Sequence, residues 1–401
     1  MAHISLKTFL GTSKETLLAH FAGIGGIVAG LIVAWQLNVF QSFPWAISVY
    51  PTVLIAKSVI TNLFSGRLNT ALHIGTIRPA IFGNTTAFHR LLRVAFVLTL
   101  MVSVAMSVVS MIFGSLFWGI NTASFSDIFM VVVATMNLGL VFYLFTLSVT
   151  FAAFKKGLDL DSFIYPVIIT ITDIFITVCY ASALYLFSGF GTTGKYCVLL
   201  VAVLPAIVIL YSLLRSINEQ EFIKAIRRSI TALILMAIIA NLTGTVLHRI
   251  DIGVSGRREI FIAYPALVAL IGDVALIIGS TATTRLALGL LKPTFSGMKD
   301  HGAQILGAWT ASAAAFILLS ALTLTAAGTF TLSSFLSFTS LLLMANLIAT
   351  VTIVLISHAF AILTFQKGLD PDHFTVPIES SLAGTMVSVA LLVALLLTSQ
   401  A

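Results

Sequence analysis

Eleven stretches of the chain are apolar over the length that a helix needs to cross a bilayer, which is about 20 residues. Only 9% of the 401 residues are charged and 59% are hydrophobic, whereas soluble domains carry roughly 25% charged residues. This excludes a soluble enzyme, a nucleic-acid-binding protein and a disordered tail, and it predicts an all-α polytopic membrane protein. The eleven stretches are centred in residues 17–39, 45–65, 92–117, 127–154, 163–187, 196–214, 229–247, 261–284, 303–327, 334–364 and 373–398.

The connections between the stretches are short, the longest being 66–91, and Lys and Arg are distributed unevenly among them. With the N-terminus in the cytoplasm, 16 of the 21 basic residues face inward, four face outward and Lys57 lies within a stretch. Because membrane proteins keep Lys and Arg on the cytoplasmic side, this asymmetry predicts a multi-pass protein of the cell membrane with its C-terminus outside. It also accounts for the net charge of +7 without a nucleic-acid partner.

The two halves of the chain repeat each other. Residues 50–79 begin with Tyr-Pro and end with Pro, as do residues 264–293, at an offset of 214. Residues 156–161 and 367–372 share Lys-Gly-Leu-Asp-x-Asp at an offset of 211. Two independent matches at nearly one offset indicate a duplication. The predicted domains are a cytoplasmic segment at 1–16, a first five-helix repeat at 17–190, a linking transmembrane helix at 191–218 and a second five-helix repeat at 219–401.

An odd number of helices in each repeat would place directly fused repeats in opposite orientations across the membrane. The linking helix returns the chain to the cytoplasm, so the two repeats are expected to be parallel, with a pseudo-twofold axis along the membrane normal. Substrate sites of duplicated transporters usually lie near the midplane where the repeats meet. The duplication therefore predicts an ion path between the repeats.

Three of the 14 acidic residues lie within the apolar stretches, namely Asp173, Asp273 and Glu379. A carboxylate at membrane depth costs at least a few kcal/mol, so such residues usually face a cavity and mark an ion path. The alternative for each is a purely structural partner or a protonated acid that is merely tolerated. The other 11 acids fall near interfaces or in connections.

Lys57 is the one base at membrane depth. One interpretation is a charge in the pore that tunes selectivity or pairs with an acid. The other is a side chain whose stem extends toward the inner interface. If the three acids and Lys57 were all ionised, their sum of −2 would suit one divalent cation.

Uncharged polar groups add weaker signals. Thr170 and Ser381 occupy equivalent positions, four residues after a proline in each repeat. Their oxygens could hold a hydrated Mg²⁺, which prefers oxygen ligands and keeps several waters, or they could join helices to one another. His20 and His358 have no ligand-like neighbour in sequence and are expected to be packing residues.

Three short motifs resemble those of a known transporter family. Residues 65–71 read S-G-R-L-N-T-A, similar to A-S-R-L-S-T-A. Gly157-Leu158-Asp159 precedes Pro166 and then Asp173, similar to a G-L-D-P motif with a proline and an acid seven residues later. Gly272-Asp273 falls where the family carries G-N. The pattern resembles the membrane domain of the MgtE magnesium transporters, and most closely the members with a duplicated domain, such as the eukaryotic magnesium-transporting solute carriers.

The resemblance implies that Asp173 recognises the ion from the fifth helix and that Asp273 faces the pore from the second helix of the other repeat. The second repeat has Gly384 in place of the acid, and the first has Ser58-Val59 in place of G-N. The predicted site is therefore asymmetric. Glu379 does not simply replace the missing acid, because five residues correspond to about 140° around a helix.

These observations predict a membrane channel or carrier for Mg²⁺, not an enzyme, in which a single chain forms a complete pore in the lipid bilayer. The alternatives are transport of another divalent cation, exchange coupled to Na⁺ or H⁺, a non-transporting scaffold or sensor, and an intramembrane aspartyl protease. The last rests on a faint likeness of Ile271-Gly272-Asp273 to G-x-G-D. The candidate ion-binding residues are Asp173, Asp273, Glu379, Thr170 and Ser381, with Lys57 as a possible pore charge.

Overall fold

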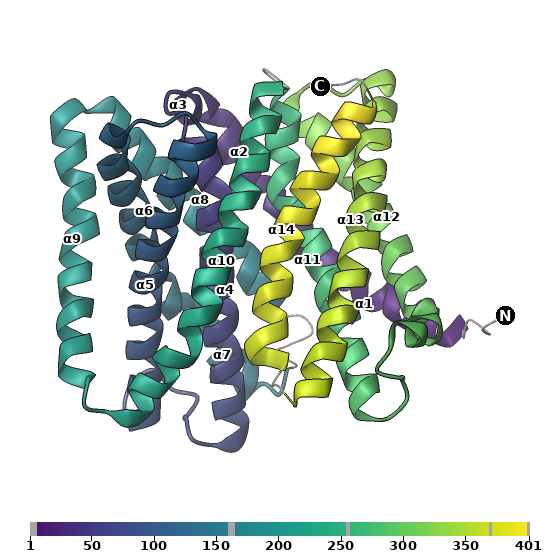
Figure 1. Cartoon of the computed structure of the whole chain (residues 1–401), viewed down its shortest axis with the longest axis horizontal. Helices are drawn as coiled ribbons and strands as arrows, with labels where there is room; N and C mark the ends of the chain where they lie inside the picture. The colour runs from purple at the N-terminus through teal and green to yellow at the C-terminus, as the bar shows by residue number, and fades with distance from the viewer. Residues whose placement is uncertain (1–5, 159–164, 254–256, 369–370, 399–401) are drawn as a thin grey trace. The chain divides into compact units, whose positions relative to one another are not determined.

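The structure is a computed structural model that describes residues 6–158, 165–253, 257–368 and 371–398 (Figure 1). Within these residues the chain forms α-helices, two short 3₁₀ helices and no strand. The elements are α1 (Leu6–Ile24), α2 (Gly26–Trp35), α3 (Leu37–Gln41), α4 (Ala46–Ile74), α5 (Thr86–Phe117), η1 (Thr122–Ser124), α6 (Phe125–Gly139), α7 (Phe142–Lys155), α8 (Tyr165–Gly189), α9 (Gly191–Ser216), α10 (Gln220–Gly253), α11 (Arg258–Ala287), η3 (Phe295–His301), α12 (Gly302–Ala327), α13 (Leu332–Lys367) and α14 (Pro371–Leu397).

Ten helical segments of the described chain are long and apolar enough to cross a membrane. The eleventh predicted span corresponds to α14, whose residues Ser381–Leu397 form a shorter apolar helix. The all-α polytopic fold is thus confirmed. Two of the ten segments are each built from two consecutive helices, α1 with α2 and α6 with α7.

The longest connection is shorter than the sequence predicted. Helix α4 continues to Ile74 and α5 begins at Thr86, so Arg67 and Arg90 lie on helices and not in a loop. The helix continues because Leu68 and Leu72 keep an apolar face buried beyond the apolar stretch. It ends at Gly75, whose φ of +79° suits glycine and closes the last turn.

The chain divides into two compact units that do not follow chain order. The split unit contains Met1–Ala34 and Arg249–Ala401, and the continuous unit contains Trp35–His248. The first helical segment of each predicted repeat, α1–α2 or most of α10, therefore packs with helices of the other repeat. The repeat boundaries themselves stay a prediction from the sequence.

One glycine contact occurs twice, and each time it joins the first helical segment of one repeat to a helix of the other. We call this arrangement the exchange of first helices. Gly30 on α2 lies directly against the main-chain carbonyl of Ile262 on α11, and Gly244 on α10 lies directly against that of Ser48 on α4. Both members of the second contact are offset by 214 from their counterparts in the first. Small residues allow two membrane helices to approach this closely.

A tyrosine hydrogen bond also occurs twice. The hydroxyl of Tyr50 lies 3.0 Å from Thr177 Oγ1, and that of Tyr264 lies 2.9 Å from Ser388 Oγ. Thr177 and Ser388 each donate to the carbonyl oxygen four residues earlier. In the second repeat that carbonyl belongs to Gly384, and in the first it belongs to Asp173.

The linking segment between α9 and α10 is fixed to the start of α5 by charge. Arg93 donates to both carboxylate oxygens of Glu219, at 2.7 and 3.1 Å, and also bonds Ser216. Arg90 lies 3.8 Å from the same carboxylate. The hydrogen bond from Arg93 lowers the pKa of Glu219 from its ordinary value, because it stabilises the ionised form. Helix α9 itself runs beside α6 in the continuous unit (Figure 1), with many apolar side chains exposed as lipid contact requires.

Candidate functional site

In the continuous unit the buried base is Lys57 on α4. Its side chain is 4% exposed, its ammonium donates to Thr61 Oγ1, and it lies 5.3 Å from the ring centroid of Phe142. The ammonium is therefore enclosed by side chains of the continuous unit. Both interpretations of Lys57, a pore charge or a stem that extends toward the inner interface, stay predictions.

Asp173 lies on α8 and interacts electrostatically with Lys57. Its Oδ1 atom is buried and has no hydrogen-bond partner among the residues described. Its main-chain carbonyl receives the Thr177 hydroxyl at 2.7 Å, which makes Asp173 the structural counterpart of Gly384. A carboxylate with an unoccupied oxygen facing an ammonium can accept either that ammonium or an incoming cation.

A break in a membrane-spanning segment lies next to Lys57. Between α6 and α7 the amides of Leu140 and Val141 bond to carbonyls three residues earlier instead of four. Gly139 ends α6 here, and a side chain added to it would contact Ile176 of α8 and the stem of Lys57. Short 3₁₀ stretches within helices often mark functional positions, and transporter sites are commonly built at discontinuous helices. The corresponding helix of the other repeat, α13, is continuous.

In the split unit, Asp273 on α11 faces a histidine of α1. Asp273 Oδ2 lies 3.1 Å from Nδ1 of His20, which is buried, whereas Asp273 is partly exposed. The Nε2 atom of His20 has no partner among the described residues. The sequence predicted that His20 is a packing residue, and this was incomplete, because His20 also bonds Asp273, one of the three acids within the apolar stretches. No local signal could reveal this pair, whose members are 253 residues apart.

The break between α1 and α2 lies beside this pair. Gly23 packs against α11 so closely that an added Cβ would lie 3.4 Å from Asp273 Oδ2. Two residues later, Gly25 separates the helices, and its amide bonds to the carbonyl of Ala22. Each unit therefore contains a broken segment next to an ionisable side chain of another helix.

Glu379 on α14 is 2% exposed and points at α11. Both of its carboxylate oxygens lie 2.6 Å from the position that a Cβ of Gly279 would occupy, so the missing side chain makes room for them. Its Oε1 atom has no hydrogen-bond partner in the described part of the chain, and Ser357 of α13 lies beside it. Gly279 is six residues from Asp273, which is about 9 Å along the helix and on another face. Glu379 therefore contacts α11 at a different position from the one that Asp273 occupies.

The remaining candidates are buried on the same two helices as the acids. Thr170 lies about one turn before Asp173 on α8, and Ser381 lies two residues after Glu379 on α14. Within the described residues, no three His, Cys, Asp or Glu side chains gather in one place. Such an arrangement does not build a closed structural metal site, but it suits Mg²⁺, which takes one or two carboxylates and keeps its waters.

Fold and site together define a class: a multi-pass α-helical membrane protein with single carboxylates, each beside its own polar partner, inside its spans. Residues 50–183 match the family model MgtE, whose description is divalent cation transporter. The match runs from Tyr50 in α4 to the second half of α8 and includes Lys57, Thr170 and Asp173. Residues 50–183 are thus similar to the MgtE family, which confirms the family resemblance for this part of the chain and points to divalent cation transport across a membrane. No curated protein and no solved structure matches the chain.

Proposed function

We propose that the protein transports Mg²⁺ across the membrane and that Asp173 is the principal carboxylate of its path. The observation that carries the proposal is the position of Asp173, within the matched MgtE segment, at membrane depth and with its Oδ1 atom unoccupied. Mg²⁺ binds hard oxygen ligands and loses its waters reluctantly. One carboxylate, assisted by the Thr170 hydroxyl one turn away, is sufficient for a partly hydrated ion.

In this proposal, Lys57 keeps cation binding at Asp173 weak enough for the ion to leave again. A lone buried carboxylate would hold a divalent cation too strongly, since electrostatic attraction increases sharply away from water. The Lys57 ammonium attracts the same carboxylate and repels the ion. Binding that is favourable but weak is what conduction requires.

The split unit has cation-binding carboxylates of its own in this proposal. His20 holds Oδ2 of Asp273, which leaves Oδ1 for the ion, and Glu379 with Ser381 forms a secondary site. The path between the repeats, the complete pore within one chain and the cytoplasmic N-terminus belong to the proposal as well. A protease role is disfavoured, because each aspartate has its own basic neighbour instead of the paired carboxylates that share a proton in aspartyl proteases.

Flux into proteoliposomes that enclose a Mg²⁺-sensitive dye tests the proposal. Asp173→Asn keeps the size of the side chain and removes its charge, so we expect Mg²⁺ influx to fall at least about tenfold, as loss of a charged ligand implies. The matched control is Asp127→Asn at the start of α6, where the carboxylate pairs with Lys195 at 3.8 Å, and it should retain wild-type flux. Wild-type flux in Asp173→Asn would refute the assignment.

The same liposomes distinguish the alternatives. Replacing Mg²⁺ by Mn²⁺, Co²⁺ or Ca²⁺ measures selectivity among divalent cations. Imposing Na⁺ or H⁺ gradients at constant Mg²⁺ tests coupling. Influx that depends on neither gradient supports uncoupled Mg²⁺ transport, and influx that requires one of them supports the exchanger.

A further inference from the structure

Two histidines near the end of α11 are completely buried. His301 is the last residue of η3 and precedes α12, and His358 lies on α13. Their ring centroids are 6.2 Å apart. Neither ring nitrogen of His301 has a hydrogen-bond partner among the described residues, and the Thr294 backbone beside His358 can engage at most one nitrogen of that ring. A neutral imidazole has one donor and one acceptor nitrogen, so each ring has an unused lone pair.

A third polar group follows His301 at helical spacing. Gln304 is buried three residues later, near the start of α12, and its Oε1 atom also has no partner in the described chain. Side chains three apart on a helix are neighbours. Buried polar side chains nearly always have a partner, and those that lack one often face a bound ion or water. The unpartnered atoms of His301, His358 and Gln304 therefore form a candidate binding site.

The spacing of the rings fits one bridging metal ion. A Zn²⁺–nitrogen bond is about 2.0–2.1 Å, and a ring nitrogen lies roughly 1.1 Å from its centroid, so the metal lies about 3.2 Å from each centroid. Two rings on one metal then have centroids about 5.2 Å apart at a tetrahedral angle and about 6.4 Å apart in line. The observed 6.2 Å lies within this range, toward its open end.

We propose that His301 and His358 bind one transition-metal dication, of the Zn²⁺, Co²⁺ or Ni²⁺ class, with Gln304 or water completing its coordination. Imidazole nitrogen suits these ions, whereas Mg²⁺ prefers oxygen. The site is therefore chemically distinct from the carboxylates of the Mg²⁺ path. It connects η3, the segment between α11 and α12, to α13.

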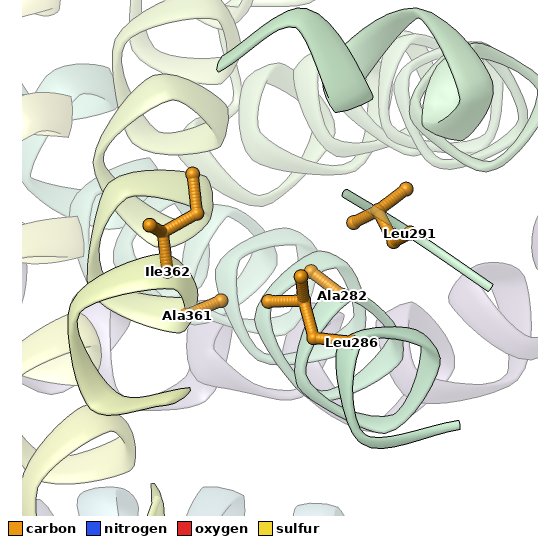
Figure 2. Packing of buried hydrophobic residues seen from close by; sticks show 5 residues of the cluster. All are labelled: Ala282, Leu286, Leu291, Ala361 and Ile362. Carbon is orange, nitrogen blue, oxygen red and sulfur yellow. The ribbon is translucent and has the colours of Figure 1, made fainter. Parts of the chain in front are cut away.

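The surroundings allow such a site to form and to be reached. An apolar cluster of α11, the following loop and α13 packs one turn from His358 and keeps the two elements together (Figure 2). The Phe295 ring lies 6.1 Å from the His358 ring but is 61% exposed, so the pair lies one side chain below the surface. The cluster consists of Ala282, Leu286, Leu291, Ala361 and Ile362.

One feature limits the affinity of the site for a metal ion, and another limits the site to one of the two units. Arg285 in the last turn of α11 interacts electrostatically with His301, and its repulsion keeps the affinity below that of a structural zinc site with four protein ligands. The first repeat lacks the pair, because its counterparts are the exposed His89 and the buried Leu147, at offsets of 212 and 211. The proposed site is thus specific to the split unit.

Cobalt binding by the full chain, purified in detergent without a histidine tag, tests the proposal. We expect one Co²⁺ per chain, visible d–d absorption bands, and displacement by Zn²⁺ but not by a large excess of Mg²⁺. His301→Gln and His358→Gln should each weaken binding at least about tenfold. His89→Gln, which changes an exposed histidine, should bind like the wild type.

Absence of binding by the wild type, or unchanged binding in the His301→Gln/His358→Gln double variant, would overturn the proposal. If the variants fail to fold, X-ray absorption at the cobalt edge of the wild-type protein decides instead. Scattering from two imidazole rings supports the site, and coordination by oxygen alone refutes it. Neither result depends on Mg²⁺ flux, so this test stands apart from that of the transport function.

Discussion

The three carboxylates within the predicted apolar stretches differ in the group that lies next to each of them. Asp173 interacts with the ammonium of Lys57, Asp273 bonds the imidazole of His20, and Glu379 lies against Gly279 with Ser357 beside it. The acids could be identified from the sequence, because a charge inside an apolar stretch is costly. Their partners could not, since these lie on other helices and a lone histidine in a span resembles a packing residue.

Replacing Lys57 by Met tests its role at Asp173. Without the ammonium, the carboxylate attracts Mg²⁺ unopposed, so we expect the half-saturating Mg²⁺ concentration to fall about tenfold, the effect of roughly 1.4 kcal/mol, and the maximal flux to decrease. Proteoliposome flux against Mg²⁺ concentration measures both. Lys155→Met, which removes an exposed lysine at the end of α7, is the control. An unchanged half-saturating concentration would contradict this role.

His20 is tested by a double-mutant cycle with Asp273. His20→Ala removes the group that holds Oδ2, and loss of a ligand's outer partner typically weakens metal binding 10–100-fold. We expect about a tenfold fall in Mg²⁺ flux at limiting Mg²⁺, partly restored in His20→Asn, which can still donate. If His20 acts through Asp273, adding His20→Ala to Asp273→Asn has little further effect. Additive losses would show that the two residues act separately.

At the scale of helices, the sequence predicts where the chain crosses the membrane but not where a crossing is broken. The α6–α7 break at Leu140 and Val141 lies in an apolar stretch whose nearest interruptions are Asn137 and Gly139. Backbone hydrogen bonds to the third preceding residue instead of the fourth leave the hydropathy of the sequence unchanged. A hydropathy plot therefore does not detect the break. The α1–α2 break had a stronger signal in Gly23, Gly25 and Gly26.

The glycine contacts between helices predict which small residues support the fold. A methyl group on Gly30 or Gly244 would collide with a main-chain carbonyl of the facing helix, and backbone cannot move as a flexible side chain can. We expect Gly30→Ala and Gly244→Ala each to lower the free energy of unfolding by about 1–3 kcal/mol. Circular dichroism melting in detergent measures the loss.

Gly66→Ala on α4 is the matched control, because an added methyl there meets no atom within 4 Å. Alanine also favours a helix over glycine, so this variant should melt at or above the wild-type temperature. Equal destabilisation by all three changes would mean that helix–helix contact is not the reason for these glycines.

At the scale of the whole chain, the sequence predicts a duplication, but it does not predict which unit each repeat's first helix joins. Matching offsets show which segments correspond. They do not show whether α1–α2 packs against α11 or α4, because these two helices correspond to each other, and the same holds for α10. Which copy occupies which groove depends on the linking segment and on the packing of particular side chains. The His20–Asp273 bond and the Gly30–Ile262 contact both join residues of different predicted repeats.

The exchange predicts how the chain behaves when it is cut after α9, into residues 1–217 and 218–401. The N-terminal half then contains α1–α2 without α11, and the C-terminal half contains α10 without α4, so each lacks a groove that its first helix fills. Expressed alone, each half should aggregate or be degraded. Expressed together with a tag on one half, they should purify as a 1:1 complex. Recovery of either half as a folded monomer would contradict the exchange, since that half would then have to pack its first helix against its own second one.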